Sequence, residues 1–154
     1  MTIGVLFVCT GNICRSPMAE GVFRSMARQA GLESAFTVDS AGTYGGHAGE
    51  PPSRLAIEAA ARRGYDISGL HARPVVAADI ARFGHVLAMD RGHLAELRRF
   101  APRGLTERPR MFASADVADP YGGTQRDYER ALDLIEAGCK SLLEALTPEA
   151  KAKG

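Results

Sequence analysis

Several features that mark other protein classes are missing from this chain of 154 residues. It has only three cysteines, an odd and sparse set that does not suit a secreted disulfide framework, so the expected localisation is cytoplasmic. No apolar run approaches the roughly 18 residues that span a bilayer. The segment Met1–Gly4 lacks the basic region of a signal peptide. We therefore expect no membrane insertion.

An excess of either charge is missing as well. Lysine and arginine total 19 against 18 aspartate and glutamate residues, so the net charge of +1 argues against a nucleic-acid partner. Cys9 and Cys14 are too far apart for a thioredoxin-type redox pair, and no matching Cys/His pair accompanies them to bind zinc. We expect neither a metal nor a cofactor.

The length and the hydrophobic content of 45% are typical of one globular domain, which we place over residues 1–154. Short apolar runs predict strands at Ile3–Val8, Phe36–Ala41 and His85–Met89, and a shorter pattern predicts one at Arg110–Phe112. A first helix is expected after Ser16, its N-cap, with Pro17 in its first turn. Further helices are expected at Pro52–Arg63, at Arg91–Phe100 with Asp90 as the cap, and at Asp127–Leu146. Alternating strands and helices indicate a parallel sheet covered on both faces, a three-layer α/β/α fold.

The segment Cys9–Pro17 (CTGNICRSP) lies where the first strand ends and the first helix begins, a position where open α/β sheets bind ligands. Gly11 and Asn12 tolerate left-handed backbone angles, so the loop can curl until successive N–H groups converge on an anion. The helix terminus adds partial positive charge, and the Arg15 guanidinium suits two phosphate oxygens. The predicted phosphate-binding residues of the loop are Thr10, Gly11, Asn12, Ile13, Cys14, Arg15 and Ser16.

Cys9 is the candidate nucleophile, beneath the bound oxyanion. The convergent amides, the helix terminus and Arg15 all favour the thiolate, the reactive form of cysteine. A thiolate there can attack phosphorus to form phosphocysteine, and the Ser16 hydroxyl can hydrogen-bond the sulfur as it leaves. A single cysteine at a strand end is more often a small buried apolar residue, but the whole pattern Cys9–Pro17 favours the catalytic role.

A thiolate nucleophile needs a proton donor for the leaving oxygen, because expulsion of a bare phenolate is slow. The best candidate is Asp119, in the segment Asp119–Gly123 (DPYGG) before the last predicted helix. Pro120 favours an extended backbone at Asp119, and the glycines mark a surface loop. Alone, such a segment is an ordinary turn; together with the thiolate motif it predicts the general acid.

These motifs, taken in order, resemble one family. Cys9–Glu20 (CTGNICRSPMAE), Asp39–Thr43 (DSAGT), Ala88–Asp90 (AMD) and Asp119–Tyr121 (DPY) look like those of a low-molecular-weight protein tyrosine phosphatase, and the match runs through nearly the whole chain. The resemblance implies four parallel strands and phosphomonoester hydrolysis without a metal. The implied substrate is a tyrosine-phosphorylated protein, with a bacterial tyrosine kinase among the candidates.

The resemblance also implies roles for single residues. Its catalytic set is Cys9 as nucleophile, Arg15 as phosphate clamp and Asp119 as general acid and then base. Asn12 is expected to hold a left-handed turn, supported by Ser16 and Ser40. Tyr121 is expected to border the substrate cleft and to stack on the phenyl ring.

Two positions depart from the family pattern. Bacterial members often carry tryptophan before a histidine in the loop after the DSAGT motif, whereas this chain has Gly46 before His47. Tyr44 is therefore the candidate for the missing aromatic wall. Members also tend to read His-x-Ala-Arg after the second helix. This chain reads LHAR at Leu70–Arg73, so His71 is displaced by one residue from the position that braces the phosphate loop.

Three other functions compete with tyrosine phosphatase. An arsenate reductase of the same fold needs resolving cysteines, but the chain has none between Cys14 and Cys139. A protein-arginine phosphatase of this family typically has threonine where this chain has the apolar Ile13. A non-catalytic phosphoprotein-binding module requires neither Cys9 nor Asp119, and both are present.

Cys14, the second cysteine of the loop, predicts redox control. Cys9 as a reactive thiolate is the natural first site of peroxide attack. A curled loop can bring residues five apart within the Cα separation of about 4.4–6.8 Å that a disulfide needs. We hypothesise that Cys14 captures oxidised Cys9; the alternative interpretation is a small residue packed under the loop.

Overall fold

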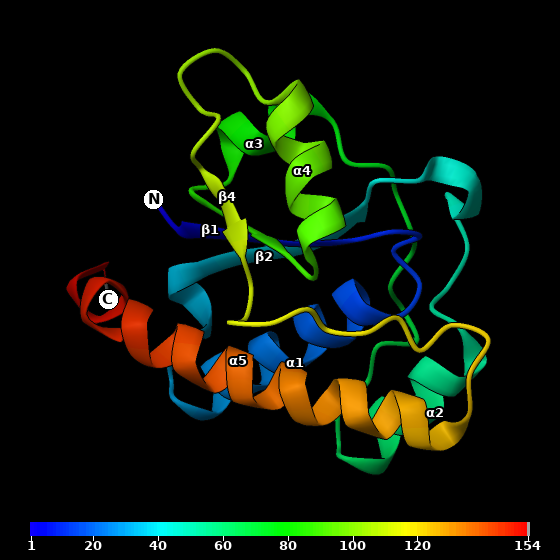
Figure 1. Ribbon diagram of the computed structural model, residues 1–154. Helices are drawn as coiled ribbons and strands as arrows, with labels where there is room; N and C mark the ends of the chain where they lie inside the picture. The colour runs from blue at the N-terminus through cyan, green and yellow to red at the C-terminus, as the bar shows by residue number, and fades with distance from the viewer. Residues whose placement is uncertain (154) are drawn as a thin grey trace.

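The computed structural model describes residues 1–153, and Gly154, the last residue of the predicted domain, lies outside this part of the chain. Four strands form one sheet: β1 (Ile3–Cys9), β2 (Phe36–Gly42), β3 (His85–Ala88) and β4 (Pro109–Met111). Their order is β2-β1-β3-β4, and all neighbouring pairs are parallel (Figure 1). The expected sheet of four parallel strands is confirmed.

Helices cover both faces of the sheet, which confirms the three-layer fold (Figure 1). One face carries α1 (Arg15–Gln29), α2 (Arg54–Arg62) and α5 (Gln125–Lys153), and the other carries α3 (Ala77–Arg82) and α4 (Arg91–Phe100). Two short 3-10 helices, η1 (Glu33–Ala35) and η2 (Gly45–His47), flank β2. No helix within residues 1–153 is long and apolar enough to cross a membrane.

The central strand β1 is buried on both faces. Phe7 packs its ring against Phe23 and Phe112, with centroids 5.9 Å and 5.7 Å away, in the core beneath α1 and α5. Leu6 and Val8 belong to a second core beneath α3 and α4. Successive side chains of a strand point to opposite faces, so a strand between two helical layers needs the continuous apolar run that the sequence shows.

The order of the strands creates the crevice that holds the site. β2 lies on one side of β1, whereas β3 and β4 lie on the other, so the chain changes direction between the ends of β1 and β3. Open α/β sheets bind ligands at such a position. The N–H of Met89 donates to the carbonyl of Val8 at 3.0 Å, which holds the end of β3 beside the end of β1. The loop after Cys9 and the start of α4 therefore meet.

The prediction that Ser16 caps the first helix is wrong. α1 begins at Arg15, and Cys14 occupies the cap position without a side-chain hydrogen bond. Ser16 is instead fully buried in the first turn, beside Pro17, where its Oγ lies 2.9 Å from Sγ of Cys9. A helix start without a side-chain cap leaves its backbone N–H groups free for a ligand.

The other elements follow the predictions with small shifts. The helix at Arg91–Phe100 behind Asp90 is confirmed. The helix predicted at Pro52–Arg63 spans Arg54–Arg62, the strand predicted at Arg110–Phe112 spans Pro109–Met111, and the last helix extends beyond Asp127–Leu146 to Gln125–Lys153. α3 was not predicted, because six residues are too few to show a helical repeat.

Candidate active site

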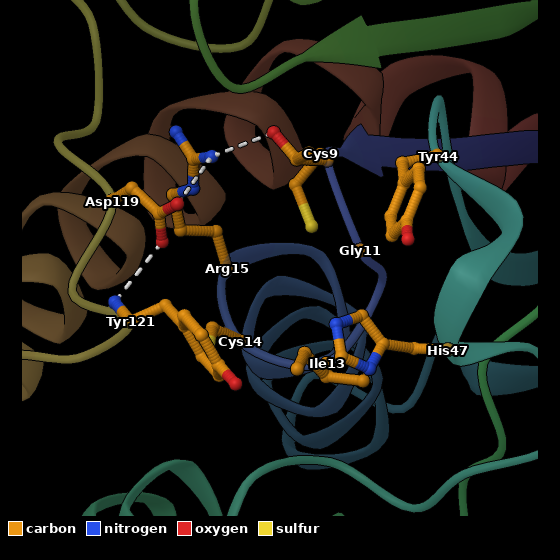
Figure 2. Close-up of a pocket in the computed structure, with 10 residues that line it drawn as sticks. Cys9, Gly11, Ile13, Cys14, Arg15, Tyr44, His47, Asp119 and Tyr121 are labelled. Atoms are coloured by element: carbon orange, nitrogen blue, oxygen red, sulfur yellow. Dashed lines mark hydrogen bonds and ion pairs between the residues drawn. The ribbon is translucent and has the colours of Figure 1, made fainter.

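A pocket opens at the crevice between the ends of β1 and β3. It is lined by Cys9, Thr10, Gly11, Ile13, Cys14, Arg15, Tyr44, His47, Asp119 and Tyr121 (Figure 2). Nine of the eleven predicted site residues are in this lining, and the other two, Asn12 and Ser16, are buried behind it. Residues 1–153 contain no cluster of three or more His, Cys, Asp or Glu side chains that could hold a metal ion.

Asn12 gives the loop its curl. It is the only non-glycine residue among residues 1–153 with a positive φ, 58°. Its Nδ2 donates to Oγ of Ser16 at 2.8 Å and to Oγ of Ser40 at 3.0 Å, as expected. Its Oδ1 accepts the backbone N–H of Arg73 at 3.0 Å, whereas His71 is exposed. The loop is thus braced by a backbone amide two residues after His71.

Gly11 does not take the left-handed angle that the sequence allowed. Its lack of a side chain serves a close approach instead, because a Cβ at Gly11 would lie 2.9 Å from Cδ2 of His47. The turn is made by Asn12 alone, whose amide can satisfy the surrounding groups as glycine could not. The imidazole of His47 consequently lies directly against the phosphate loop.

A buried polar chain supports the loop from behind. Ser40 donates its hydroxyl proton to Oε1 of Glu20 at 2.7 Å, and Glu20 is buried. Burial raises the pKa of Glu20, while hydrogen bonds from Ser40 and Arg24 oppose the shift. Arg24 holds the other oxygen of Glu20 at 3.0 Å and 2.8 Å. Because the Ser40 hydroxyl donates its proton to Glu20, its oxygen can only accept the hydrogen bond from Asn12.

The Arg15 guanidinium is 2% exposed and has a free edge. Its NH1 donates to Oδ2 of Asp90 at 2.9 Å and to the carbonyl of Val117 at 2.8 Å, which uses both hydrogens of that nitrogen. Its Nε is buried without a hydrogen-bond partner, and its NH2 has two longer contacts, 3.3 Å to Oγ1 of Thr10 and 3.6 Å to Oδ2 of Asp119. The Nε–NH2 edge is thus left for two oxygens of an anion.

Arg15 also holds the loop that carries Asp119. The N–H of Val117 donates to the carbonyl of Met89 at 2.9 Å, and the carbonyl of Val117 accepts from Arg15. Asp119, two residues further on, lies 3.6 Å from NH2 of Arg15 and accepts the N–H of Tyr121 at 3.1 Å. Its side chain is 49% exposed, so a solvent-accessible carboxyl group lines the pocket.

Cys9 lies at the base of the pocket and is 2% exposed. Cys14 also lines the pocket, and its Sγ lies 3.4 Å from both Oγ of Ser53 and the hydroxyl of Tyr128. Burial raises the pKa of Cys14, hydrogen bonds with Ser53 and Tyr128 oppose the shift, and a charge on Cys9 raises it further. Cys14 is therefore held as a thiol.

Aromatic rings surround the mouth of the pocket. Figure 2 shows Tyr121 on one side and Tyr44 and His47 on the other. The His47 ring centroid lies 6.0 Å from that of Tyr44 and 6.1 Å from that of Tyr121. A Cβ at Gly46 would overlap the Tyr44 ring, so Tyr44 lies across the position where bacterial members of the resembled family carry tryptophan. Tyr44 and His47 together form this wall.

Sequence reasoning missed four residues that contact the loop Cys9–Pro17. They are Asp90 as the partner of Arg15, Val117 as its carbonyl acceptor, His93 at 2.8 Å from the Thr10 hydroxyl, and Tyr128 against Cys14. The signal for Asp90 is the AMD motif at Ala88–Asp90, one of the motifs that resemble the family, although the sequence predicts Asp90 only as a helix cap. Asp90 performs both tasks, because Oδ1 accepts the N–H of His93 at 2.9 Å while Oδ2 faces Arg15.

The comparisons with known proteins decide the family. The model of the low molecular weight phosphotyrosine protein phosphatases matches residues 4–152. The chain belongs to this family. The low molecular weight protein-tyrosine-phosphatase YfkJ of Bacillus subtilis is 40% identical over 154 residues, which cover 96% of this chain and 97% of YfkJ. The expected enzyme class, a low-molecular-weight protein-tyrosine-phosphatase, is confirmed.

Solved structures of the family have the same fold. The crystal structure of YfkJ matches this phosphatase with a TM-score of 0.90 at 39% identity and covers 97% of each chain. Wzb of Vibrio vulnificus, solved in complex with benzylphosphonate, matches with a TM-score of 0.85 at 27% identity, over 95% of this chain and 100% of Wzb. The resemblance drawn from the sequence motifs is confirmed.

Asp90 gives this phosphatase a testable acid sensitivity. Burial by itself would raise the pKa of Asp90, but the N–H of His93 and the guanidinium of Arg15 outweigh it and lower the pKa below its ordinary value. Because the pKa of Asp90 is lower in the folded than in the unfolded state, its ionised carboxylate stabilises the fold at pH values above the unfolded-state pKa of about 3.9. This stabilisation is lost as the pH falls through the folded-state pKa. Asp90→Asn should therefore destabilise the protein at pH 7, with a difference that shrinks below about pH 4.

Urea unfolding from pH 7 to pH 3 measures this difference. Glu144→Gln, which changes an exposed carboxylate on α5, is the matched control and should follow the wild type. A destabilisation by Asp90→Asn that stays constant over this pH range would show that the ionised carboxylate is not what holds Arg15.

Proposed function

We propose that this phosphatase hydrolyses phosphotyrosine in proteins through a phosphocysteine intermediate on Cys9. The observation that carries the proposal is the free Nε–NH2 edge of the buried Arg15, which lies in one pocket with Cys9 and Asp119. We treat residues 1–154 as a single phosphatase domain. No step needs a metal or a cofactor.

In the first step the phosphoryl group binds between the loop amides, the start of α1 and the free edge of Arg15. The Cys9 thiolate attacks phosphorus, so an S–P bond forms while the P–O bond to the tyrosine ring breaks. Asp119 gives its proton to the departing phenol oxygen, which leaves as neutral tyrosine. The exposure of Asp119 at the pocket wall supports this role.

In the second step the Asp119 carboxylate takes a proton from water, and the oxygen of that water attacks phosphorus. The P–S bond breaks and Cys9 leaves as a thiolate. The hydrogen-bond directions support stabilisation of this thiolate by Ser16. Because Ser16 accepts from Asn12 at 2.8 Å, its own proton is free to be donated to Sγ of Cys9 at 2.9 Å.

The pocket walls favour an aryl phosphate as substrate. Tyr44 and Tyr121 are 58% and 59% exposed on opposite sides of the pocket mouth, where a phenyl ring can pack against them. Ile13 lines the same pocket with an apolar side chain, which gives no hydroxyl to assist water in phosphoarginine hydrolysis. Cys139 is fully buried on α5 and donates to the carbonyl of Ala19, which does not suit the cysteine relay of an arsenate reductase.

Two further parts of the proposal concern the cell. We propose a cytoplasmic site of action, where a reducing environment keeps Cys9, Cys14 and Cys139 as the free thiols found in the structure. A tyrosine-phosphorylated protein is the proposed partner, and an autophosphorylated bacterial tyrosine kinase is the first one to assay.

The function is tested by turnover and binding measured together. Wild-type protein should hydrolyse phosphotyrosine well above phosphoarginine and should not reduce arsenate. Cys9→Ser should abolish turnover but still bind inorganic phosphate in calorimetry, because the loop amides and Arg15 bind the anion without sulfur chemistry. Arg15→Ala should lose both. Comparable hydrolysis by the Cys9→Ser variant would overturn the phosphocysteine mechanism.

The role of Asp119 is tested by varying the leaving group. General acid catalysis contributes about 10²- to 10⁴-fold and matters most when the leaving oxygen is basic. Asp119→Ala should therefore slow hydrolysis of phosphotyrosine more than hydrolysis of p-nitrophenyl phosphate, whose leaving group needs no proton. Equal slowing of both substrates would show that another group donates the proton.

Reversible oxidation of Cys9 belongs to the same proposal. Peroxide converts the Cys9 thiolate to a sulfenic acid, and Cys14 then attacks the sulfenic sulfur, expelling water as a disulfide forms. Dithiothreitol restores both thiols by thiol–disulfide exchange. The presence of both cysteines in one pocket lining supports this step.

Recovery after oxidation tests the pair. After a peroxide pulse, wild-type protein should regain most of its initial activity with dithiothreitol, and mass spectrometry should show a Cys9–Cys14 link. Cys14→Ser should regain little of its own initial activity, because unprotected Cys9 proceeds to the sulfinic acid. Full recovery of the Cys14→Ser variant, with no link in the wild type, would leave Cys14 as a packing residue.

A further inference from the structure

A buried histidine that the mechanism above does not use lies beside Arg15. His93, in the first turn of α4, is 4% exposed. Its Nε2 lies 2.8 Å from Oγ1 of Thr10 and 3.5 Å from NH2 of Arg15. Its Nδ1 accepts the backbone N–H of Asp90 at 3.2 Å. Both ring nitrogens therefore face groups that position the phosphate clamp.

These contacts fix where the proton of the imidazole resides. Oδ1 of Asp90 also lies 3.2 Å from Nδ1, but only the backbone N–H of Asp90 points at that nitrogen as a hydrogen bond. Nδ1 is thus an acceptor, and the single proton of neutral His93 is on Nε2. Nε2–H then donates to Thr10, whereas its contact with Arg15 at 3.5 Å joins two donors and is no hydrogen bond.

The tautomer of His93 decides what the Thr10 hydroxyl can do. Oγ1 of Thr10 accepts from Nε2 of His93 and from NH2 of Arg15 at 3.3 Å, which occupies both lone pairs of the hydroxyl. Its own proton is left to be donated, and Thr10 lines the pocket. With the other tautomer, Nε2 would take the Thr10 proton and nothing would remain for a ligand.

We propose that His93 is a positioning residue that, as the Nε2–H tautomer, makes the Thr10 hydroxyl a hydrogen-bond donor to the bound phosphoryl group and an anchor for NH2 of Arg15. This rests on the proposed function in assuming that the anion in the pocket is a phosphoryl group. His93 itself touches neither substrate nor sulfur; it acts through Thr10 and Arg15.

Burial, together with the guanidinium of Arg15, favours the neutral form of His93. Burial and the guanidinium of Arg15 lower its pKa, while the carboxylates of Asp90, Asp119 and Asp116 oppose the shift without reversing it. A doubly protonated ring would present Nδ1–H to the Asp90 N–H and place a second cation beside Arg15. The neutral form is the one that both hydrogen bonds require.

Two substitutions separate the two ring nitrogens. In His93→Gln the longer amide can reach Thr10 with an N–H donor, as Nε2 does, but cannot accept from Asp90 in the same way. In His93→Asn the shorter amide can accept the Asp90 N–H, as Nδ1 does, but cannot reach Thr10. Thr10→Val removes the hydroxyl itself, and His71→Asn changes an exposed histidine outside the site as the control.

The readout is the dissociation constant of inorganic phosphate measured by calorimetry, with the stability of each variant measured by urea unfolding. His93→Asn and Thr10→Val should each weaken phosphate binding about tenfold, the effect of one lost hydrogen bond to a charged group. The double variant should be no weaker than Thr10→Val, because both remove the same bond. His93→Gln should stay within about threefold of the wild type.

Long-range ¹H–¹⁵N spectra of the imidazole report the tautomer in the wild-type protein and need no variant. They should show a proton on Nε2 and none on Nδ1 of His93. A proton on Nδ1, or a His93→Gln variant that binds phosphate as weakly as His93→Asn, would overturn the proposal. If phosphate binding depends on His93 as stated but phosphotyrosine is not hydrolysed, the proposed function fails and this inference stands. If phosphotyrosine is hydrolysed but the His93 variants bind phosphate as tightly as the wild type, this inference alone fails.

Discussion

The guanidinium of Arg15 joins three segments that are far apart in the chain. Its NH1 bonds to Asp90 after β3 and to the carbonyl of Val117, two residues before Asp119, while its own backbone starts α1. A buried charge is costly unless its donors are paired, so these segments are held together by the need to satisfy one side chain. The free Nε–NH2 edge remains for the substrate. In the proposed function, binding of the phosphoryl group and placement of Asp119 are thus two results of one constraint.

A second network of hydrogen bonds, which ends at the Glu20 carboxyl group and its ion pair with Arg24, supports the loop behind Cys9. Donation runs in one direction, from Asn12 to Ser16 and to Ser40, and from Ser40 to the buried Glu20. Because Ser16 accepts rather than donates in this network, its hydroxyl proton can be donated to the sulfur of Cys9. In the proposed mechanism, Arg15 thus binds the phosphoryl group while Ser16 donates to the sulfur that leaves.

The parts of the site that lie close together in sequence were predictable. The residue types and spacing of the loop Cys9–Pro17 predict an anion site. The positive φ of Asn12 was expected because asparagine tolerates the left-handed conformation. Asp119 was predicted because the proposed chemistry requires an acid, and the structure places it in the pocket lining. The continuous apolar run of β1 and the alternation of strands with helices predicted the layers of the fold, and burial on both faces of β1 agrees with them.

Contacts between distant segments were not predictable, because they depend on how the layers pack. Nothing in the local sequence indicates that His93 of α4 reaches Thr10 after β1, or that Tyr128 of α5 reaches Cys14. Gly11 was predicted as a turn residue, but its missing side chain makes room for His47.

Identification of the phosphocysteine tests the proposed mechanism most directly. Acid quench of the enzyme during turnover of a ³²P-labelled phosphotyrosyl peptide should leave label on Cys9 alone; no label, or label on another residue, would contradict it.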